Sequence, residues 1–457
     1  MNQQSGSVAV LWSSCLAMLA VGANSTAIMA ALPNMRTELL LSSDGVQWAV
    51  NAYLVVSAAF IVLGGKAADR FGARLVSIVG LVLFGIASCI IATASSQTAL
   101  LAGRALQGLA AAFAVPSTLA AVDASAATER RAAVIGAWTG FLMLGFSIGP
   151  LLGGALTHFT GWRVIFWLNV LLMLVAIAGL ASAGSATART ACGKPSRRAD
   201  WIGFVLLATF MVSLVFALHA LPHVTAAPLR VVGPFLLAAT TFFLLLAAES
   251  RAEAPLVELS FFARRGFVMG LAIGALSMFS IMTLLLYFNL YAQSPQALGL
   301  TALEAGTMLL PLCAALLALA LSASALATRI GLRNAIAGGM VLIAIACVVI
   351  GVAIAEGGMT PMVIGFFVMG AGLAVPYALA PRLALSALAP AQAGQGSGIV
   401  NACTFLGGSV GVAGGAIAFD LGGIVAVLSI IALAGIIGAA LSRGISETAE
   451  TRRVSAA

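Results

Sequence analysis

Residues 64–74 read GGKAADRFGAR and join two apolar runs, at 46–65 and 75–94. A helix that spans a bilayer needs about 20 mostly apolar residues, and both runs supply them. Two such helices joined by a short loop form a hairpin whose turn requires unusual backbone angles, which glycine tolerates. Gly72 can therefore supply the turn. The stretch predicts a pair of membrane-spanning helices with a tight polar turn at one face.

The charges of this turn indicate the face of the membrane on which it lies. Arg70 and Arg74 favour the cytoplasmic side, because short cytoplasmic loops carry an excess of Lys and Arg. Asp69 can cap or pair at the end of a helix. A turn that only set the topology would explain the basic residues but not Asp69, so we expect this carboxylate to have a further role.

The composition of the whole chain is that of a membrane protein. Hydrophobic residues make up 62% and charged residues 8% of the 457 residues. A soluble domain is about half apolar and about a quarter charged, and a soluble protein as apolar as this one could not cover its surface. The net charge of +8 comes from basic residues between apolar segments, where they set topology. We therefore expect no nucleic-acid partner.

The cysteines give no sign of a metal site or of a disulfide framework. None of the six has CxxC spacing, and all but Cys192 lie in apolar segments. They are interpreted as small buried hydrophobic residues. Residues 1–8 lack the positive charge of a cleaved signal peptide, so the first apolar run is expected to be retained.

Fourteen apolar runs are long enough to span the membrane. Their approximate bounds are 9–32, 46–65, 75–94, 99–121, 133–156, 163–184, 201–220, 229–248, 267–291, 304–327, 335–354, 361–384, 398–418 and 423–442. The predicted fold class is therefore an all-α polytopic membrane protein. With the N-terminus inside, seventeen Lys and Arg residues lie inside and three outside. This positive-inside pattern predicts that both termini are cytoplasmic.

Two longer charged stretches, at 185–200 and 249–265, divide the spans into groups of six, two and six. We predict an N-terminal six-helix bundle at 1–184, a cytoplasmic linker with two extra helices and a charged connector at 185–265, a C-terminal six-helix bundle at 266–444, and a cytoplasmic tail at 445–457.

The two predicted bundles share sequence features. Residues 70–74 read RFGAR and residues 329–333 read RIGLR, which is an offset of 259 residues. The triplet SIG at 147–149 has a counterpart SVG at 409–411, which is an offset of 262 residues. Two six-helix halves related by such a repeat are typical of secondary transporters.

The span at 99–121 carries a charge inside the membrane, in the stretch RALQGLAAA that begins at Arg104. An arginine within hydrocarbon costs at least about 2.5–3.5 kcal/mol unless it faces a polar interior. Gln107 follows one turn on and favours such an interior. The alternative is that Arg104, close to the end of the span, extends to the membrane interface.

The span at 133–156 contains GFSIGPLLGG, residues 145–154. Glycines four residues apart share one helix face, where another backbone can approach closely. A proline inside the helix removes one hydrogen bond and can kink it. We expect a close seam formed by the helix-packing motif Gly145, Gly149, Pro150, Gly153 and Gly154.

These motifs resemble those of the major facilitator superfamily. Residues 64–74 resemble its G-x-L-A-D-R-x-G-R-K loop with Ala67 at the Leu position, 104–108 resemble its R-x-x-Q-G motif, and 145–154 resemble the motif of its antiporters. The two extra central helices are similar to those of its fourteen-helix drug/proton antiporter (multidrug efflux) branch. Further stretches resemble the same branch, namely PLVELSFFARRGF at 255–267, Gln47-Trp48 with Tyr53, GWRVIFWLN at 161–169, GQGSGIVN at 394–401 and LGGSVGVA at 406–413.

The resemblance implies a transporter and no enzymatic activity. The chain would export small amphiphilic compounds, such as drugs and antibiotics, by alternating access in exchange for protons across the bacterial cytoplasmic membrane. It would need no cofactor beyond the proton gradient as energy source. Its partners would be a small-molecule substrate and the lipid bilayer, and a monomer suffices for this fold. A uniporter or importer of a neutral or anionic metabolite, without proton coupling, is the alternative.

The first span departs from the pattern of that branch. Asn24 occupies the position of a membrane-embedded Asp, and Met29 occupies that of an Asn. Asn24 cannot titrate, and the other carboxylates close to spans lie near their ends, at Asp123, Glu304 and Asp420. Because nothing there offsets two positive charges, a dicationic substrate is disfavoured. A neutral, zwitterionic or anionic amphiphile fits better.

Polar and aromatic residues on the spans are the candidates for substrate binding and coupling, because transporter sites lie near the midplane. They are Asn24, Gln47, Asn51, Tyr53, Arg104, Gln107, Trp138, Tyr287, Asn289, Tyr291, Tyr377 and Asn401. Each side chain can equally well form a hydrogen bond between helices. We favour Asn24, Arg104, Asn289 and Asn401.

A second candidate group is a cytoplasmic latch around the 64–74 turn. Its expected members are Gly65, Asp69, Arg70, Gly72, Arg74 and Asp123. Asp123 lies at the inner end of its span, where it could pair with Arg70 or Arg74. We expect this latch to be made and broken as the transporter changes state.

Overall fold

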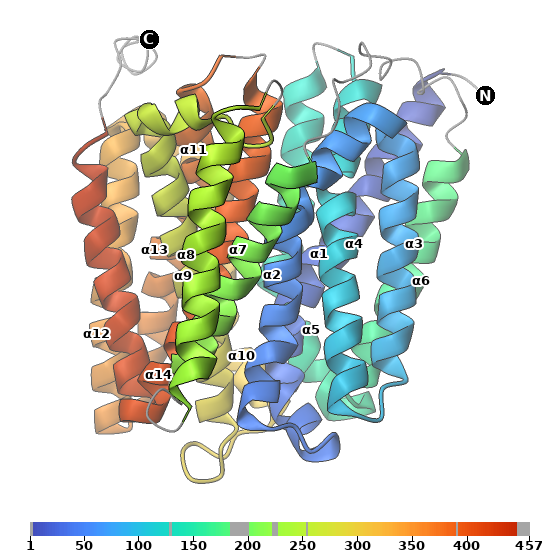
Figure 1. Cartoon of the computed structure of the whole chain (residues 1–457). Coiled ribbons are helices and arrows are strands. Elements are labelled where there is room, and N and C mark those ends of the chain that lie inside the picture. Colours follow the sequence, from blue (N-terminus) through green and yellow to red (C-terminus); the bar gives the residue numbers. More distant parts are fainter. Residues whose placement is uncertain are drawn as a thin grey trace. The chain divides into compact units, whose positions relative to one another are not determined.

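The computed structural model of the chain describes residues 3–127, 130–182, 201–221, 227–252, 255–389 and 392–445. These residues form α-helices joined by short turns (Figure 1). The helices of the first half are α1 (Gln3–Glu38), α2 (Ser43–Phe71), α3 (Ala73–Ala92), α4 (Gln97–Ser125), α5 (Arg131–Thr160), α6 (Arg163–Ser182), α7 (Trp201–Ala220) and α8 (Pro228–Glu249). A short 3-10 helix, η4 (Leu259–Ala263), precedes α9 (Arg265–Ala292), α10 (Ala302–Met308), α11 (Leu310–Ile330), α12 (Leu332–Glu356), α13 (Met359–Ser386) and α14 (Ala393–Ser442).

Within the described residues, 13 helices are long and apolar enough to cross a membrane. The last of them, α14, has 50 residues, far more than the roughly 20 of one crossing. Gly422 and Gly423 interrupt it with non-helical backbone angles, and Gly423 has a positive φ of 60°. The break divides α14 into two crossings at the point where the sequence separates its last two spans. The predicted count of fourteen spanning helices is thereby confirmed.

Large apolar side chains on the outside of the helices show what surrounds them. On α6, Leu171, Leu174 and Val175 are each more than half exposed. Continuous apolar surface of this kind is unfavourable in water but not in hydrocarbon. The chain is therefore a multi-pass membrane protein whose outer surface faces lipid.

The chain forms two compact units. Unit 1 comprises residues 1–214 and 235–257, and unit 2 comprises residues 215–234 and 258–457. The sequence assigned α7 and α8 to a separate segment at 185–265, whereas each of these helices contributes residues to both units. The bundle boundaries at 184, 265 and 444 stay predictions.

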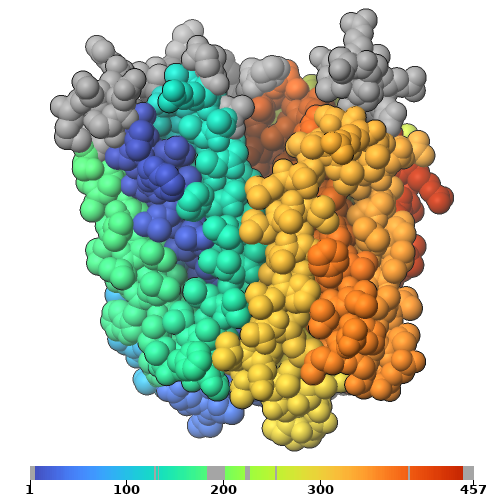
Figure 2. Space-filling model, turned by 180° about the vertical axis from the view of Figure 1, so that it is seen from behind, coloured from blue at the N-terminus to red at the C-terminus, as the bar shows by residue number. Residues whose placement is uncertain are grey.

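In unit 1, α1 packs most extensively on α5 and also lies against α6. Figure 2 shows the N-terminal part of α1, in violet-blue, between α5 in teal and α6 in green. The glycines of α5 form the α1 contact. A Cβ at Gly145 would collide with the backbone of Leu19, and one at Gly153 with the backbone of Ala27. At Gly149 a Cβ would strike the hydroxyl of Thr26.

In unit 2 the same arrangement recurs between α14 and α9. Gly407, Gly411 and Gly415 follow Gly145, Gly149 and Gly153 at an offset of 262 residues. A Cβ on them would collide in turn with Ala275, Phe279 and Tyr287 of α9. The glycine seam that the sequence predicts is thus a contact inside each unit, formed once in each half of the repeat.

The turns at 64–74 and 329–333 also repeat in backbone conformation. Gly72 is the single residue between α2 and α3, with φ 94° and ψ 131°. Gly331 is the single residue between α11 and α12, with φ 86° and ψ 147°. Residues with a Cβ rarely adopt these positive φ values, so glycine alone fits both turns without strain.

Candidate functional site

Arg104 of α4 is fully buried in unit 1, with 0% of its surface exposed. Its Nε donates to the carbonyl oxygen of Ala49 at 2.7 Å, and its Nη1 donates to Oε1 of Gln107 at 2.7 Å. The guanidinium also lies 4.7 Å from the centre of the Tyr53 ring. Arg104 therefore faces the interior and does not extend to the membrane interface. Its Nη2 has no hydrogen-bond partner among the described residues.

The polar contacts of Arg104 continue through Gln107 to a third helix. Gln107 lies three residues along α4, on the same face as Arg104. Its Nε2 donates to Oγ of Ser88 on α3 at 2.9 Å, and Ser88 donates to the carbonyl oxygen of Phe84 at 2.7 Å. This series, which we call the Arg104 chain, joins α2, α4 and α3 through buried hydrogen bonds.

Gly108 explains how α2 comes close enough to take part. A Cβ at this position would lie 3.1 Å from the Cα of Tyr53, closer than side chains normally pack. The hydroxyl of Ser57 donates to the carbonyl oxygen of Gly108 at 3.1 Å. The R-x-x-Q-G pattern therefore contains the cation, its acceptor and the small residue that admits the neighbouring backbone.

Asn24 of α1 is also buried, with 1% of its surface exposed. Its Oδ1 accepts a hydrogen bond from Nδ2 of Asn169 on α6 at 2.8 Å. Its own Nδ2 has no hydrogen-bond partner among the described residues. The next residue, Ser25, donates to the hydroxyl of Tyr53 at 3.3 Å, and Tyr53 lies against Arg104. Asn24 is thus next in sequence to a residue whose side chain reaches Tyr53, the aromatic neighbour of Arg104.

Three further candidates in unit 1 lie on α2 and α5. Asn51 is fully buried and Gln47 is half-buried. Trp138 is buried, and its Nε1 donates to Oγ1 of Thr118 on α4 at 3.2 Å. The hydrogen bond of Trp138 ties α5 to α4, so Trp138 serves helix packing in this structure.

Three of the candidates in unit 2 have their donors bonded to carbonyl oxygens of the same unit. Nδ2 of Asn289 donates to the carbonyl oxygen of Leu285 at 2.7 Å, and Nδ2 of Asn401 donates to that of Ser397 at 3.0 Å. The hydroxyl of Tyr287 donates to the carbonyl oxygen of Val412 at 2.7 Å. Tyr291 and Tyr377 are half-buried. The three asparagines thus differ in the hydrogen bonding of Nδ2. Among the described residues this atom has no partner in Asn24, whereas in Asn289 and Asn401 it donates to a carbonyl oxygen of the same helix.

The expected partner of Asp123 was wrong. Asp123 forms a bidentate ion pair with Arg131, at the start of α5, and not with Arg70 or Arg74. Arg74 instead donates to the carbonyl oxygens of Leu180 at 2.8 Å and Ala181 at 2.7 Å. Asp123 meets Arg131 because α5 begins a few residues after Asp123. Arg74 instead faces the last carbonyls of α6, which have no partner within that helix.

The remaining residues of the 64–74 turn lie at the surface or close to it. Asp69 and Arg70 are exposed, and Gly65 is half-buried. The guanidinium of Arg70 lies 5.4 Å from the centre of the Phe71 ring. In the described part of the chain, neither Asp69 nor Arg70 takes part in an ion pair. The latch function of this group stays a prediction.

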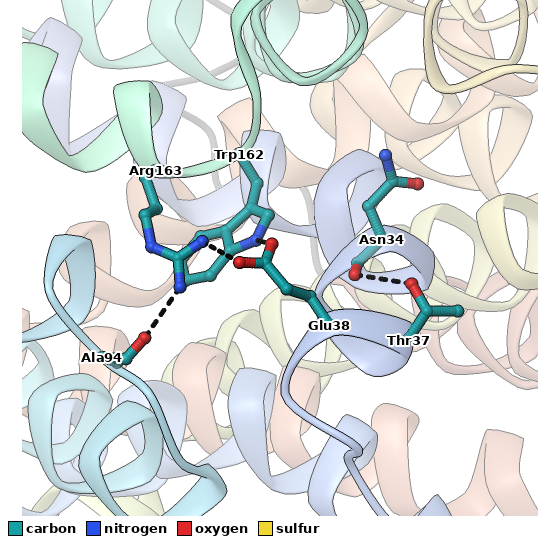
Figure 3. Close-up of polar contacts among 6 residues, drawn as sticks. All are labelled: Asn34, Thr37, Glu38, Ala94, Trp162 and Arg163. Atoms are coloured by element: carbon teal, nitrogen blue, oxygen red, sulfur yellow. Dashed lines mark hydrogen bonds and ion pairs between the residues drawn. The ribbon is translucent and has the colours of Figure 1, made fainter.

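A second polar cluster joins helix ends in unit 1. Figure 3 shows the carboxylate of Glu38, at the end of α1, pointing toward Trp162 and Arg163 at the start of α6. Nε1 of Trp162 donates to Glu38 at 2.6 Å, and Arg163 forms an ion pair with the same carboxylate. Nη2 of Arg163 also donates to the carbonyl oxygen of Ala94, in the turn between α3 and α4, at 3.0 Å. This Glu38 tie holds three helix ends together.

Sequence reasoning missed three residues that the structure places among the buried polar groups. Asn169 could have been found, since it is an Asn inside an apolar run. Ser88 could not, because serines are common in these helices and only packing distinguishes this one. Glu249 ends α8 and is 4% exposed, although a carboxylate at a helix end is expected to be hydrated.

The fold and the site together define a class. Fourteen apolar helices, a glycine seam repeated in both halves and a buried polar chain around an intramembrane arginine are features of a secondary transporter. The family model of the Major Facilitator Superfamily matches residues 14–354. The chain belongs to this superfamily, which is a family of transporters, and the predicted resemblance is confirmed.

Three curated relatives are similar over most of the chain. The tetracenomycin C resistance and export protein of Streptomyces glaucescens is 31% identical over 408 residues, which are 88% of this chain and 74% of that protein. The methylenomycin A resistance protein of Bacillus subtilis is 33% identical over 68% of this chain and 66% of that protein. The multidrug resistance protein Stp of Mycobacterium tuberculosis is 28% identical over 84% of this chain and 70% of that protein.

Two solved structures share the fold. The human organic anion transporter MFSD10 (TETRAN) has a TM-score of 0.63 at 17% identity, and the likeness covers 97% of this chain and all of that one. An auto-inhibited POT family peptide transporter has a TM-score of 0.69 at 15% identity and covers 97% of this chain and 98% of its own. At these identities the likeness shows the fold alone. The superfamily match and the names of the curated relatives make the chain a multi-pass transporter of small molecules rather than an enzyme.

Proposed function

We propose that this transporter exports small amphiphilic compounds, of the kind used as drugs and antibiotics, by alternating access. The names of the similar proteins support export and resistance. The observation that carries the proposal is the Arg104 chain, because a fully buried arginine in a membrane protein marks a substrate or ion pathway. The apolar helices around Arg104 provide the apolar wall that an amphiphile needs. The hydrogen-bonding groups of the Arg104 chain provide the polar contacts for its head group.

We further propose that export is driven by protons moving in the opposite direction. Such coupling needs a group that binds a proton on one side and releases it on the other. Asn24 cannot do so. Among the described residues, Glu249 is the buried carboxylate, with 4% of its surface exposed. We assign the proton-binding step to Glu249 of α8.

The proposed setting is the cytoplasmic membrane of a bacterium, with both termini in the cytoplasm. The distribution of seventeen basic residues inside against three outside supports this orientation. One chain carries both halves of the repeat, so a monomer suffices.

A uniporter or importer of a neutral or anionic metabolite is the second candidate. The observation that favours it is Asn24, which leaves the described residues of α1 to α6 without a titratable carboxylate away from helix ends. The two candidates differ in their dependence on the proton gradient, which makes them separable in one assay.

The test uses inverted membrane vesicles that contain the protein. Respiration sets up a pH gradient that quenches a fluorescent dye, and a panel of amphiphilic drugs is then added. Proton-coupled export predicts drug-dependent dequenching that is absent in the Arg104→Ala variant, with equal protein amounts confirmed by immunoblot. Drug protection of cells without any dequenching would exclude proton coupling and point to another coupling ion or to facilitated efflux.

The role of Glu249 is tested in the same vesicles. We expect Glu249→Gln to abolish drug-dependent dequenching, because the neutral amide cannot carry a proton. Glu356→Gln is the matched control, since Glu356 also ends its helix, α12, but is exposed. Dequenching at the wild-type level in Glu249→Gln would remove Glu249 from the coupling step.

A further inference from the structure

In the described part of unit 1, two buried N–H donors have no acceptor, in addition to the hydroxyls of Ser14, Ser147 and Thr157. Among the described residues, Nη2 of Arg104 and Nδ2 of Asn24 make no hydrogen bond. Both side chains are almost completely buried, at 0% and 1% exposure. A buried donor without an acceptor is unfavourable, and such groups in native proteins call for an explanation. Because both atoms can only donate, the missing partner is an acceptor.

Among the described residues, Arg104 forms no ion pair with a carboxylate. The described carboxylates of α1 to α6 are Glu38, Asp44, Asp69 and Asp123, and all lie within a turn of a helix end. Glu38 is paired with Arg163, and Asp123 is paired with Arg131. The carbonyl of Ala49, the amide of Gln107 and the ring of Tyr53 offset part of the charge of Arg104, but none of them is an anion.

We propose that Arg104 and Asn24 form an anion site that binds the carboxylate, or a similarly acidic oxygen, of the exported compound. A carboxylate accepts from guanidinium and amide donors in charge-assisted hydrogen bonds, which are about twice as strong as neutral ones. This inference rests on the proposed export function and names the charge class of its substrate. Burial in one state fits an alternating transporter, because the site meets its ligand in another state of the cycle.

In this site the amide of Asn24 has a function of its own. An aspartate at this position would bring a negative charge into the proposed site and would repel an anionic substrate. The asparagine keeps the hydrogen-bonding shape without the charge, so the positive charge of Arg104 is available to the ligand. Asn24→Asp should therefore change which head group the protein prefers while leaving the apolar wall intact.

The experiment measures binding of three probes to the purified full-length chain by fluorescence. The probes are pyrene with a carboxylate, a hydroxyl or an ammonium group at the end of the same butyl chain. We expect the wild type to bind the carboxylate at least about tenfold more tightly than the ammonium probe. Arg104→Gln and Asn24→Asp should each abolish this preference, and Asn24→Asp should also tighten binding of the ammonium probe.

Asn334→Asp is the matched control, because it makes the same chemical change at an exposed position of α12 and should leave the preference unchanged. If Arg104→Gln does not fold, Asn24→Asp alone decides the question. Equal binding of the three probes by the wild type, or a preference for ammonium, would overturn the anion site. Export in the vesicle assay would still stand.

The choice of buffer salt distinguishes a substrate carboxylate from a small inorganic anion as the occupant of the site. Replacing chloride by a bulky sulfonate should leave the carboxylate preference in place if the donors bind the substrate. A carboxylate affinity that chloride competes away completely would assign the donors to a small inorganic anion and overturn the substrate assignment.

Discussion

At the scale of single residues, the polar groups inside unit 1 form a connected series. Arg104 depends on Gln107 for one of its acceptors, and Gln107 in turn depends on Ser88. In the low-dielectric interior of a membrane protein, each bond in such a series matters more than it would in water. The series was partly predictable. Arg104 and Gln107 stand out as polar residues in an apolar run, whereas Ser88 and Asn169 are identified by their neighbours in space.

Replacing Gln107 by methionine tests this dependence. Methionine has a similar length but offers no strong acceptor, so Nη1 of Arg104 would lose its partner. We expect the free energy of unfolding to fall by about 1–3 kcal/mol, which a thermal-shift measurement on the purified protein would detect. Gln296→Met, at an exposed position, is the control. An unchanged melting temperature in Gln107→Met would show that the series contributes nothing to stability.

At the scale of helices, glycine positions decide which surfaces meet. The α5 motif was predicted to be a close seam, and its three spaced glycines do admit the backbone of α1. Periodicity identified the face but not the partner helix. The partner depends on how six helices pack together, and that information is not local to the motif.

Gly149→Leu should impair transport strongly without preventing insertion into the membrane. Its side chain would occupy the space of Thr26, and overpacking of this kind costs about 1–3 kcal/mol. Gly136→Leu on the same helix is the control, since a Cβ there meets no atom within 4 Å. Drug protection of cells, with membrane insertion checked by immunoblot, measures both variants. Full protection by Gly149→Leu would contradict the seam.

The Glu38 tie is expected to matter much less for stability. The side chains of Arg163 and Glu38 are 35% and 49% exposed, and ion pairs with that much contact to solvent contribute at most about 1 kcal/mol. Glu38→Gln keeps an acceptor for Trp162 and removes the ion pair. We predict that the variant melts at a slightly lower temperature than the wild type. Added salt should screen the ion pair of the wild type and so narrow this difference. A large decrease would show that the tie holds the three helix ends more firmly than its exposure implies.

At the scale of the whole molecule, the two units share an internal repeat. The turns at Gly72 and Gly331 have the same left-handed backbone conformation, and the glycine seams of α5 and α14 follow at nearly the same offset. Sequence alone revealed the spans, their number and this repeat, because all three depend on local composition. It did not reveal the pairing of Asp123 with Arg131 or the burial of Glu249, because those depend on which helix ends meet.

The repeat predicts that equivalent substitutions have equivalent effects. Gly72→Val and Gly331→Val each place a β-branched residue at a positive φ, where such residues are strained by about 1–3 kcal/mol. We expect both variants to lose a similar fraction of drug protection. Loss in only one of them would show that the two turns have different roles in the transport cycle.

The central claim is that this chain moves an amphiphile across a membrane and that Arg104 takes part. Flux of the pyrene carboxylate probe in proteoliposomes with purified protein tests it most directly. The account predicts flux at least about tenfold above that of empty liposomes for the wild type and close to that of empty liposomes for Arg104→Gln. Wild-type flux no greater than that of empty liposomes, or equal flux in Arg104→Gln, would contradict it.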